Sequence, residues 1–101
     1  MAVTSSYLAK IKRAVRITSA ASEIAQELTD TVEECRADLT RLGIPTAVVN
    51  DEDDVHILDA VKRYARWRFA MDAPEALRCQ AEYHEKADEL RKSAGYGYAD
   101  E

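Results

Sequence analysis

Residues 54–69 read DVHILDAVKRYARWRF, and the spacing of their side chains decides how the chain folds. Four cations and three aromatic rings alternate in the second half, as in surfaces that stack and neutralise nucleic acid. At about 100° per residue, the same side chains separate onto two faces of a helix. The apolar ones cover an arc of roughly 200°, wider than the stripe of an ordinary surface helix. We therefore predict a helix over 54–70 that is covered on more than one side.

Arg68 lies inside this apolar arc, whereas the other cations of the stretch gather on the remaining face. A charge among apolar side chains has to extend to water, pair with a carboxylate or reach a neighbouring subunit. Trp67 and Met71 belong to the same arc, near its C-terminal end. The candidate subunit-interface residues are therefore Arg68, Trp67 and Met71.

Two helices are predicted before this stretch. A stripe of apolar residues indicates a first helix over 5–15, capped by Thr4 or Ser5. A longer second helix follows and ends near Leu42, because Gly43 can adopt the left-handed conformation that ends a helix. Its apolar seam has a mean spacing of about 3.5 residues and consists of Ala21, Ile24, Leu28, Val32 or Thr31, Cys35, Leu39 and Leu42. Such a seam is typical of the central helix of a bundle, and it also suits pairing with another chain.

Residues 43–53 are predicted to form a loop. Ile44, Val48 and Val49 are apolar, so part of the loop should fold onto the core or pair as a short extended segment. The acidic run 51–54 lacks the alternation and the glycine of a calcium-binding loop. Carboxylates just before a helix cap it and complement its dipole, so we predict a helix start there and no metal site.

A fourth helix is predicted after a turn. Asp72 suits its cap, Pro74 its first turn, and Glu75 the third position of a capping box. The helix runs to about Ser93, and its apolar stripe consists of Ala76, Cys79, Tyr83, Ala87, Leu90 and Ala94. Its outer face is mixed in charge and expected to be solvated, with Glu82, Glu85, Lys86, Asp88, Glu89, Arg91 and Lys92.

The expected fold is all-α, a small bundle of about four helices with a long second helix and a flexible C-terminal tail. The 101 residues are enough for one domain and too few for two. We assign residues 1–94 to a single helical domain and residues 95–101 to the tail, where two glycines alternate with Tyr96 and Tyr98. These tyrosines are either loose ends or groups that order against a partner.

Composition argues against several classes of protein. The net charge of −5 disfavours a strongly cationic nucleic-acid binder. Cys35 and Cys79 lie far apart and outside any zinc-ligand pattern, so we expect two reduced thiols.

No apolar run approaches the roughly 20 residues of a membrane span. His56 and His84 have no nucleophile at a suitable spacing and no phosphate-binding loop is present, so we expect neither an enzyme nor a cofactor.

The order and spacing of the helices point to a known family. The pattern consists of Asp54, Ile57, Ala60, Val61, Tyr64 and Phe69, then Asp72, Pro74, Ala76, Tyr83 and Leu90, preceded by VRITSAASEIAQEL and LGI. Over residues 7–93 it resembles the phage head–tail connector family, the head-completion or adaptor proteins of tailed bacteriophages. One departure is that Phe69 is followed by Ala70 instead of the family's frequent glycine. Alanine tolerates a left-handed cap poorly, so we expect this turn to be built differently.

The resemblance implies a small helical subunit of a ring at the head–tail interface of the virion, assembled in the host bacterial cytoplasm. The ring would dock on the portal protein and is expected to be twelvefold to match it. It would extend the DNA channel, with packaged DNA passing through without specific binding, and carry a stopper or another tail-side connector protein. The family's C-terminal segments commonly reach toward the portal, which makes Tyr96 and Tyr98 candidate portal-docking residues.

Two other interpretations stay open at this point. A small helical nucleic-acid-binding or regulatory module would use Lys62, Arg63, Arg66 and the cations of the first helix, and its DNA affinity would fall steeply with salt. A coiled-coil-like interaction module would use the seam of the second helix.

Overall fold

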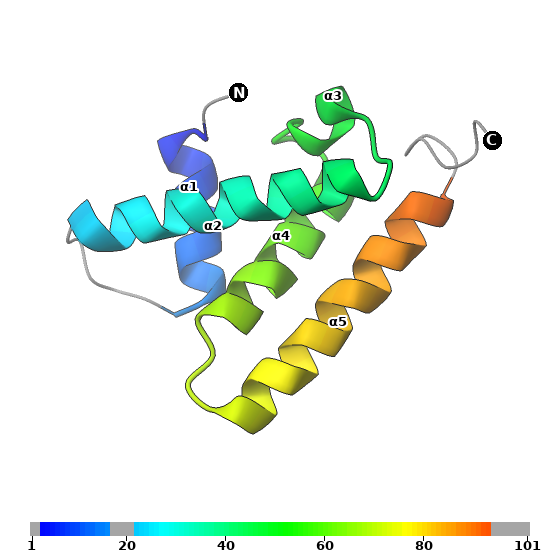
Figure 1. The fold of residues 1–101 in the computed structure, drawn as a ribbon. Helices are drawn as coiled ribbons and strands as arrows, with labels where there is room; N and C mark the ends of the chain where they lie inside the picture. Colours follow the sequence, from blue (N-terminus) through cyan, green and yellow to red (C-terminus); the bar gives the residue numbers. More distant parts are fainter. Residues whose placement is uncertain (1–2, 17–21, 94–101) are drawn as a thin grey trace.

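The computed structural model describes residues 3–16 and 22–93, and these residues confirm an all-α fold (Figure 1). No strand occurs within the described ranges. The helices are α1 (Ser5–Ala14), α2 (Ser22–Arg41), α3 (Thr46–Val49), α4 (Val55–Arg68) and α5 (Ala73–Lys92). The four longer helices lie where the sequence predicts them, and α3 is an additional single turn. The predicted tail, with Tyr96 and Tyr98, lies outside the described residues, as do Ala21 and Ala94.

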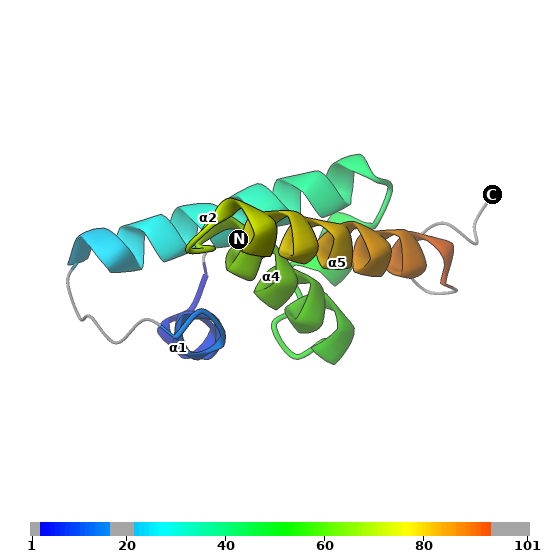
Figure 2. The ribbon, with the colours of Figure 1, turned by 90° about the horizontal axis from the view of Figure 1, so that it is seen from below.

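Helix α4 lies at the centre and packs against α1, α2 and α5. Figure 1 shows α5 running antiparallel beside α4 while α2 crosses it, and Figure 2 shows α1 below the N-terminal half of α2, which it contacts. The fully buried side chains of α4 are Ile57, Ala60, Val61 and Ala65. They confirm the wide apolar arc, because three neighbouring helices are needed to cover them.

The C-terminal end of α4 differs from the sequence prediction at one residue. Met71 was placed on the apolar arc, but it is 90 % exposed. The helix ends at Arg68, so the helical period that defines the arc does not extend to Met71. The C-cap residue Phe69 has φ −107, and Arg16 is the one non-glycine residue with positive φ in the described ranges. The turn after Ala70 is thus built without a left-handed residue, as the missing glycine predicts.

The predicted caps are present. The Thr4 side chain accepts from the Tyr7 amide at 3.2 Å, and Asp54 Oδ1 accepts from the Ile57 amide at 3.1 Å. Asp72 Oδ1 accepts from the Glu75 amide at 2.8 Å, while the Glu75 carboxylate accepts from the residue before the cap, at 3.0 Å. Each cap satisfies an amide that the helix itself leaves without a partner, which fixes where the helix starts.

The loop over residues 43–53 folds onto the core through a single helical turn. Ile44 and Val49 are buried, as predicted, whereas the alternative of an extended segment is wrong. The amides of Val48 and Val49 both bond to the Pro45 carbonyl at 3.0 Å. A lone extended segment would leave such groups without partners, whereas one turn of helix satisfies them locally. Gly43, with φ +105, ends α2 as expected.

The seam of α2 is filled within the chain. Leu28, Val32, Cys35 and Leu39 are buried in the core, and Ile24 and Leu42 pack against it. The seam therefore serves a bundle, and these buried residues leave no apolar stripe for a coiled-coil partner.

A polar junction joins α2 to α5 inside this core. The buried Tyr83 hydroxyl donates to Asp38 Oδ2 at 2.6 Å, and the Cys35 thiol lies 4.0 Å from the same hydroxyl. Burial raises the pKa of Tyr83 well above its usual range, so the phenol stays neutral and remains a donor. The buried hydroxyl thus donates to a charged acceptor. Hydrogen bonds of this kind are among the stronger ones in proteins.

A second junction joins α1 to α2 and to the loop before α4. Glu52 accepts from the Thr4 amide at 3.1 Å and from Arg36 Nη2 at 3.2 Å, and the Arg36 guanidinium lies 5.5 Å from the Tyr7 ring centre. Burial raises the pKa of Tyr7 to about 12. Its buried hydroxyl has no hydrogen-bond partner in the described part of the chain. Tyr7 thus contributes as a packed ring and not as a donor.

We expect Tyr83→Phe to lower the free energy of unfolding by about 2 kcal/mol, because it removes a hydrogen bond to a charged acceptor. Tyr7→Phe is the matched control and should be neutral or slightly stabilising, since its hydroxyl is buried without a partner. Urea denaturation of the purified variants measures both values. Equal losses in the two variants would contradict the importance of the hydrogen bond to Asp38.

The contribution of Asp38 should depend on pH. Partial burial raises the pKa of Asp38, but hydrogen bonds from Tyr83 and Arg41 outweigh burial and bring it below the ordinary 3.8. A carboxylate whose pKa is lowered by folding stabilises the folded state fully at pH values above its unfolded-state pKa. This stabilisation is lost as the pH falls through the folded-state pKa. The difference in stability between wild type and Tyr83→Phe should therefore be full near neutral pH and shrink below about pH 4. Denaturation at several pH values checks this, and a difference that grows on acidification would contradict it.

Candidate interaction surfaces

Arg68 lies at the end of α4 and satisfies its charge within the chain. Its side chain is 49 % exposed, and its Nε lies 3.9 Å from the Glu34 carboxylate on α2. The guanidinium also lies 5.7 Å from the centre of the Trp67 ring, a cation–π distance. Arg68 thus reaches water and a carboxylate together, two of the three outcomes expected for a cation inside the arc.

The other two candidate interface residues differ in accessibility. Trp67 is half-buried, with its ring centre 5.3 Å from that of Tyr64, 6.3 Å from Tyr83 and 5.8 Å from His84. Its ring therefore contributes mainly to an aromatic cluster within the subunit. Met71 is exposed in the α4–α5 turn, and Leu77 is exposed nearby on the first turns of α5. This end of the hairpin consequently presents apolar side chains to solvent.

An acidic cleft of about 300 Å³ lies between α2 and the C-terminal end of α4. It is lined by Glu27, Asp30, Thr31, Glu34, Arg68 and Phe69. Three carboxylates and one guanidinium give these lining residues a net charge of −2. The sequence analysis did not single out the carboxylates, although their spacing of three and four residues places them on one side of a helix.

Helix α1 and the two residues that follow it carry positive charge, opposite to the charge of the cleft. Residues 3–16 include Lys10, Lys12, Arg13 and Arg16 and no acidic residue. No ion pair joins these four side chains to another residue that the structure describes. The surface of α1 is therefore a cationic stripe without an internal partner.

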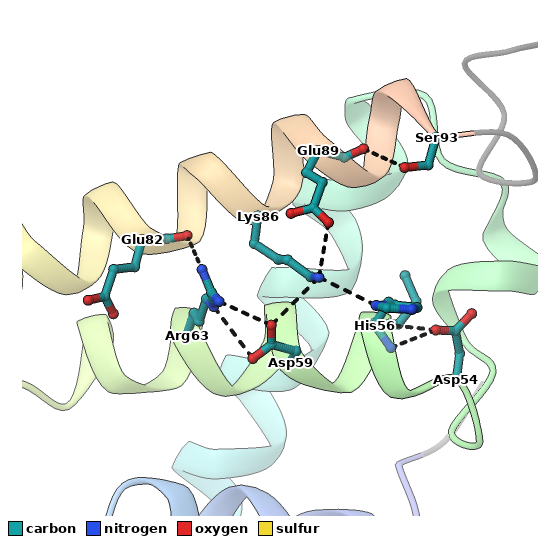
Figure 3. Close-up of polar contacts among 9 residues, drawn as sticks. Asp54, His56, Asp59, Arg63, Glu82, Lys86, Glu89 and Ser93 are labelled. Carbon is teal, nitrogen blue, oxygen red and sulfur yellow. Dashed lines mark hydrogen bonds and ion pairs between the residues drawn. The ribbon is translucent and has the colours of Figure 1, made fainter.

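A polar cluster around the buried Lys86 fixes α5 on α4 (Figure 3). Lys86 is only 7 % exposed, so its predicted place on the solvated outer face is wrong. Its ammonium lies 3.7 Å from Asp59 Oδ2 on α4, 3.5 Å from Glu89 Oε2 and 3.4 Å from His56 Nδ1. Asp59 also pairs with Arg63 at 3.3 Å. Two carboxylates from facing helices thus share one ammonium.

The burial of Lys86 has a geometric cause. Position 86 follows the buried Tyr83 by three residues and precedes the buried Leu90 by four, so it borders the apolar stripe of α5. The long apolar stem of a lysine can line such a border while its head reaches a carboxylate. The facing carboxylate, Asp59, comes from another helix, so spacing within α5 alone did not reveal the pair.

The described residues show no arrangement of reactive groups. His56 lies beside Lys86, while the His84 ring packs near Trp67. Cys35 and Cys79 are buried and free, and burial raises the pKa of the Cys35 thiol, which disfavours the reactive thiolate. No group of three or more potential metal ligands occurs in the part that the structure describes. Within that part, no helix is long and apolar enough to cross a membrane.

A family model described as "phage connector protein" matches residues 7–97, nearly the whole chain. The chain belongs to this family. No curated protein and no solved structure gives a significant match. A phage connector protein is a structural component of the virion that associates with other head or tail proteins. The cleft, the cationic stripe and the exposed apolar residues of this connector are therefore its candidate assembly surfaces.

We expect Lys86→Glu to lower the free energy of unfolding of the connector by about 3 kcal/mol, because it places a third carboxylate against Asp59 and Glu89. Lys92→Glu is the matched control on the same helix. Its exposed ion pair with Asp88 should contribute about 1 kcal/mol or less. Thermal and urea denaturation compare the two variants, and similar small losses in both would contradict a buried role for Lys86.

Proposed function

We propose that this connector is the subunit of a ring that docks on the portal protein and extends the DNA channel of the head. The ring would also provide the attachment surface for a stopper or another tail-side connector protein. The observation that carries the proposal is the family match over residues 7–97. The structure supports it with a subunit whose core is filled from within, while charged and apolar groups at its surface stay available. Such a role requires neither turnover nor a cofactor.

A ring fits the kind of surface that the connector presents. Head-to-tail contacts between identical subunits close when the rotation from one subunit to the next divides a full turn. We propose a twelvefold ring, which would match the portal. The proposed contact includes Arg68, Met71 and the accessible part of Trp67.

The distribution of charge supports a conduit over a DNA-binding module. Arg63 is paired with Asp59 and donates to the Glu82 carbonyl at 3.2 Å, and Arg68 lies near Glu34. Arg63 and Arg68 are therefore partly neutralised inside the subunit, whereas Lys62, Arg66 and the α1 cations have no ion pair among the described residues. With a net charge of −5, a ring of such subunits would let DNA pass without strong binding. The proposed location is the head–tail interface of the virion, after assembly in the host bacterial cytoplasm.

The proposal is tested with phage heads that lack this protein. We expect the purified connector to co-sediment with portal-bearing heads and to restore tail attachment, measured as infectious particles. Heads without portal are the control and should not bind it. A connector that ignores portal-bearing heads, but retards free DNA in a salt-sensitive manner, would overturn the proposal in favour of the nucleic-acid-binding alternative.

We propose that residues 95–101 contribute to portal docking through Tyr96 and Tyr98. Deletion of this segment should leave the free energy of unfolding unchanged and weaken binding to portal-bearing heads, because it removes two large aromatic contacts. Deletion of residues 99–101 alone is the matched control, since it keeps both tyrosines. Equal head binding by both truncated forms would remove these tyrosines from the docking surface.

A further inference from the structure

Positive and negative charge are divided between two neighbouring helices of the connector. Residues 3–16 carry four cations and no acid, whereas residues 22–34 carry five acids and no cation. Figure 2 shows α1 lying below the N-terminal half of α2 at the same end of the molecule, and the two helices contact each other. The overall charge of −5 conceals this division, because the two sets largely offset each other.

The acidic side has a shape that suits a cationic side chain. Glu27, Asp30 and Glu34 line a cleft of about 300 Å³ together with Thr31, Arg68 and Phe69, so the cleft stays acidic with one cation at its edge. At roughly 30 Å³ per water molecule, this space corresponds to about ten waters, enough for a guanidinium or ammonium group. Asp30 Oδ1 accepts from Gln26 at 2.9 Å, and Glu34 Oε1 lies 3.4 Å from the Tyr64 hydroxyl and 3.9 Å from Arg68. The second oxygen of each carboxylate and the whole Glu27 carboxylate have no side-chain partner among the described residues. The carboxylates therefore retain acceptor capacity for a cation from outside.

The cationic side is equally open. Lys10, Arg13 and Arg16 follow one another at intervals of three residues and are all exposed. The exposed residues beside them on α1 include Ser6 and Ala9, whose small side chains allow another surface to approach closely. Like charges three residues apart repel one another, so an opposing acidic surface would relieve that repulsion.

We infer that the α2 cleft of one connector receives the α1 cations of the next copy, with Lys10 and Arg13 as the inserted side chains. This inference rests on the proposed ring and specifies its subunit contact. The two surfaces are different patches of one subunit, so the contact is head to tail and repeats from copy to copy. Complementary charge also fixes which sides meet, because the two alternative pairings would place like charges together.

The inference is tested by reversing the charge of the α2 cleft, of the α1 cations, and of both together. The first variant is Glu27→Lys with Asp30→Lys, the second is Lys10→Glu with Arg13→Glu, and the third combines all four changes. Each one-sided variant should bind portal-bearing heads at least roughly tenfold more weakly than wild type, because like charges then face each other around the ring. The combined variant restores opposite charges at every contact and should recover most of the binding.

A matched control changes the net charge but leaves the α2 cleft and the α1 cations unchanged. Asp53→Lys with Glu85→Lys alters two exposed residues by the same total charge as the first variant, and it should bind heads as wild type does. Circular dichroism and thermal denaturation establish that each variant is folded. Mixing the two one-sided variants gives a second readout, because every contact between unlike subunits in an alternating ring would pair opposite charges.

The outcomes separate this inference from the proposed function. If wild type fails to bind heads, the proposed function itself fails. If wild type binds and the one-sided variants bind equally well, the contact inferred here is overturned and the function stands. If the one-sided variants lose binding and the folded combined variant does not recover it, the inference is also overturned. In that case, weakened DNA retardation by the Lys10 and Arg13 variant would identify nucleic acid as the partner of the stripe.

Discussion

Burial of α4 on three sides is the constraint on which the rest of the structure depends. A helix with an apolar arc of roughly 200° is not stable beside a single partner, since much of the arc would face water. Helices α1, α2 and α5 each cover part of it. Ala60 and Ala65 are fully buried on α4, and residues this small let neighbouring helices approach closely. The remaining polar positions of α4, such as Asp59 and Arg63, then have to find partners at the edges of these contacts.

The connector satisfies most of its buried polar groups within one chain but leaves many charged groups of α1 and α2 at the surface without an ion pair among the described residues. Inside, Asp38 accepts from Tyr83, and Glu52 joins three segments of the chain. Outside, the cations of α1 and several acids of α2 have no such partners in the described residues. A subunit organised in this way keeps charged groups at its surface, which suits a protein that associates with other virion proteins.

Local signals made most of the fold predictable from the sequence. Caps such as Asp54 and Asp72 act on amides two or three residues away, and Gly43 ends its helix through its own backbone. The burial of Lys86 depends on Asp59, which comes from a different helix, so spacing within one helix misplaced it. The residues of the candidate surface show the same difference between local signals and contacts from other helices. Arg68 was evident because its charge conflicts with its own helix face, whereas the cleft carboxylates stand out only once the end of α4 lies beside them.

The position of Lys86 has a mechanical consequence. Sliding α5 by one turn along α4 would bring either Glu82 or Leu90 to the place of the ammonium beside Asp59. The first would oppose two carboxylates and the second would leave a carboxylate against a hydrocarbon group, so both shifted registers are disfavoured. The two helices of the α4–α5 hairpin are therefore fixed in register and do not slide along each other. Axial load on either helix would be shared by both, a useful property for a structural component of a virion.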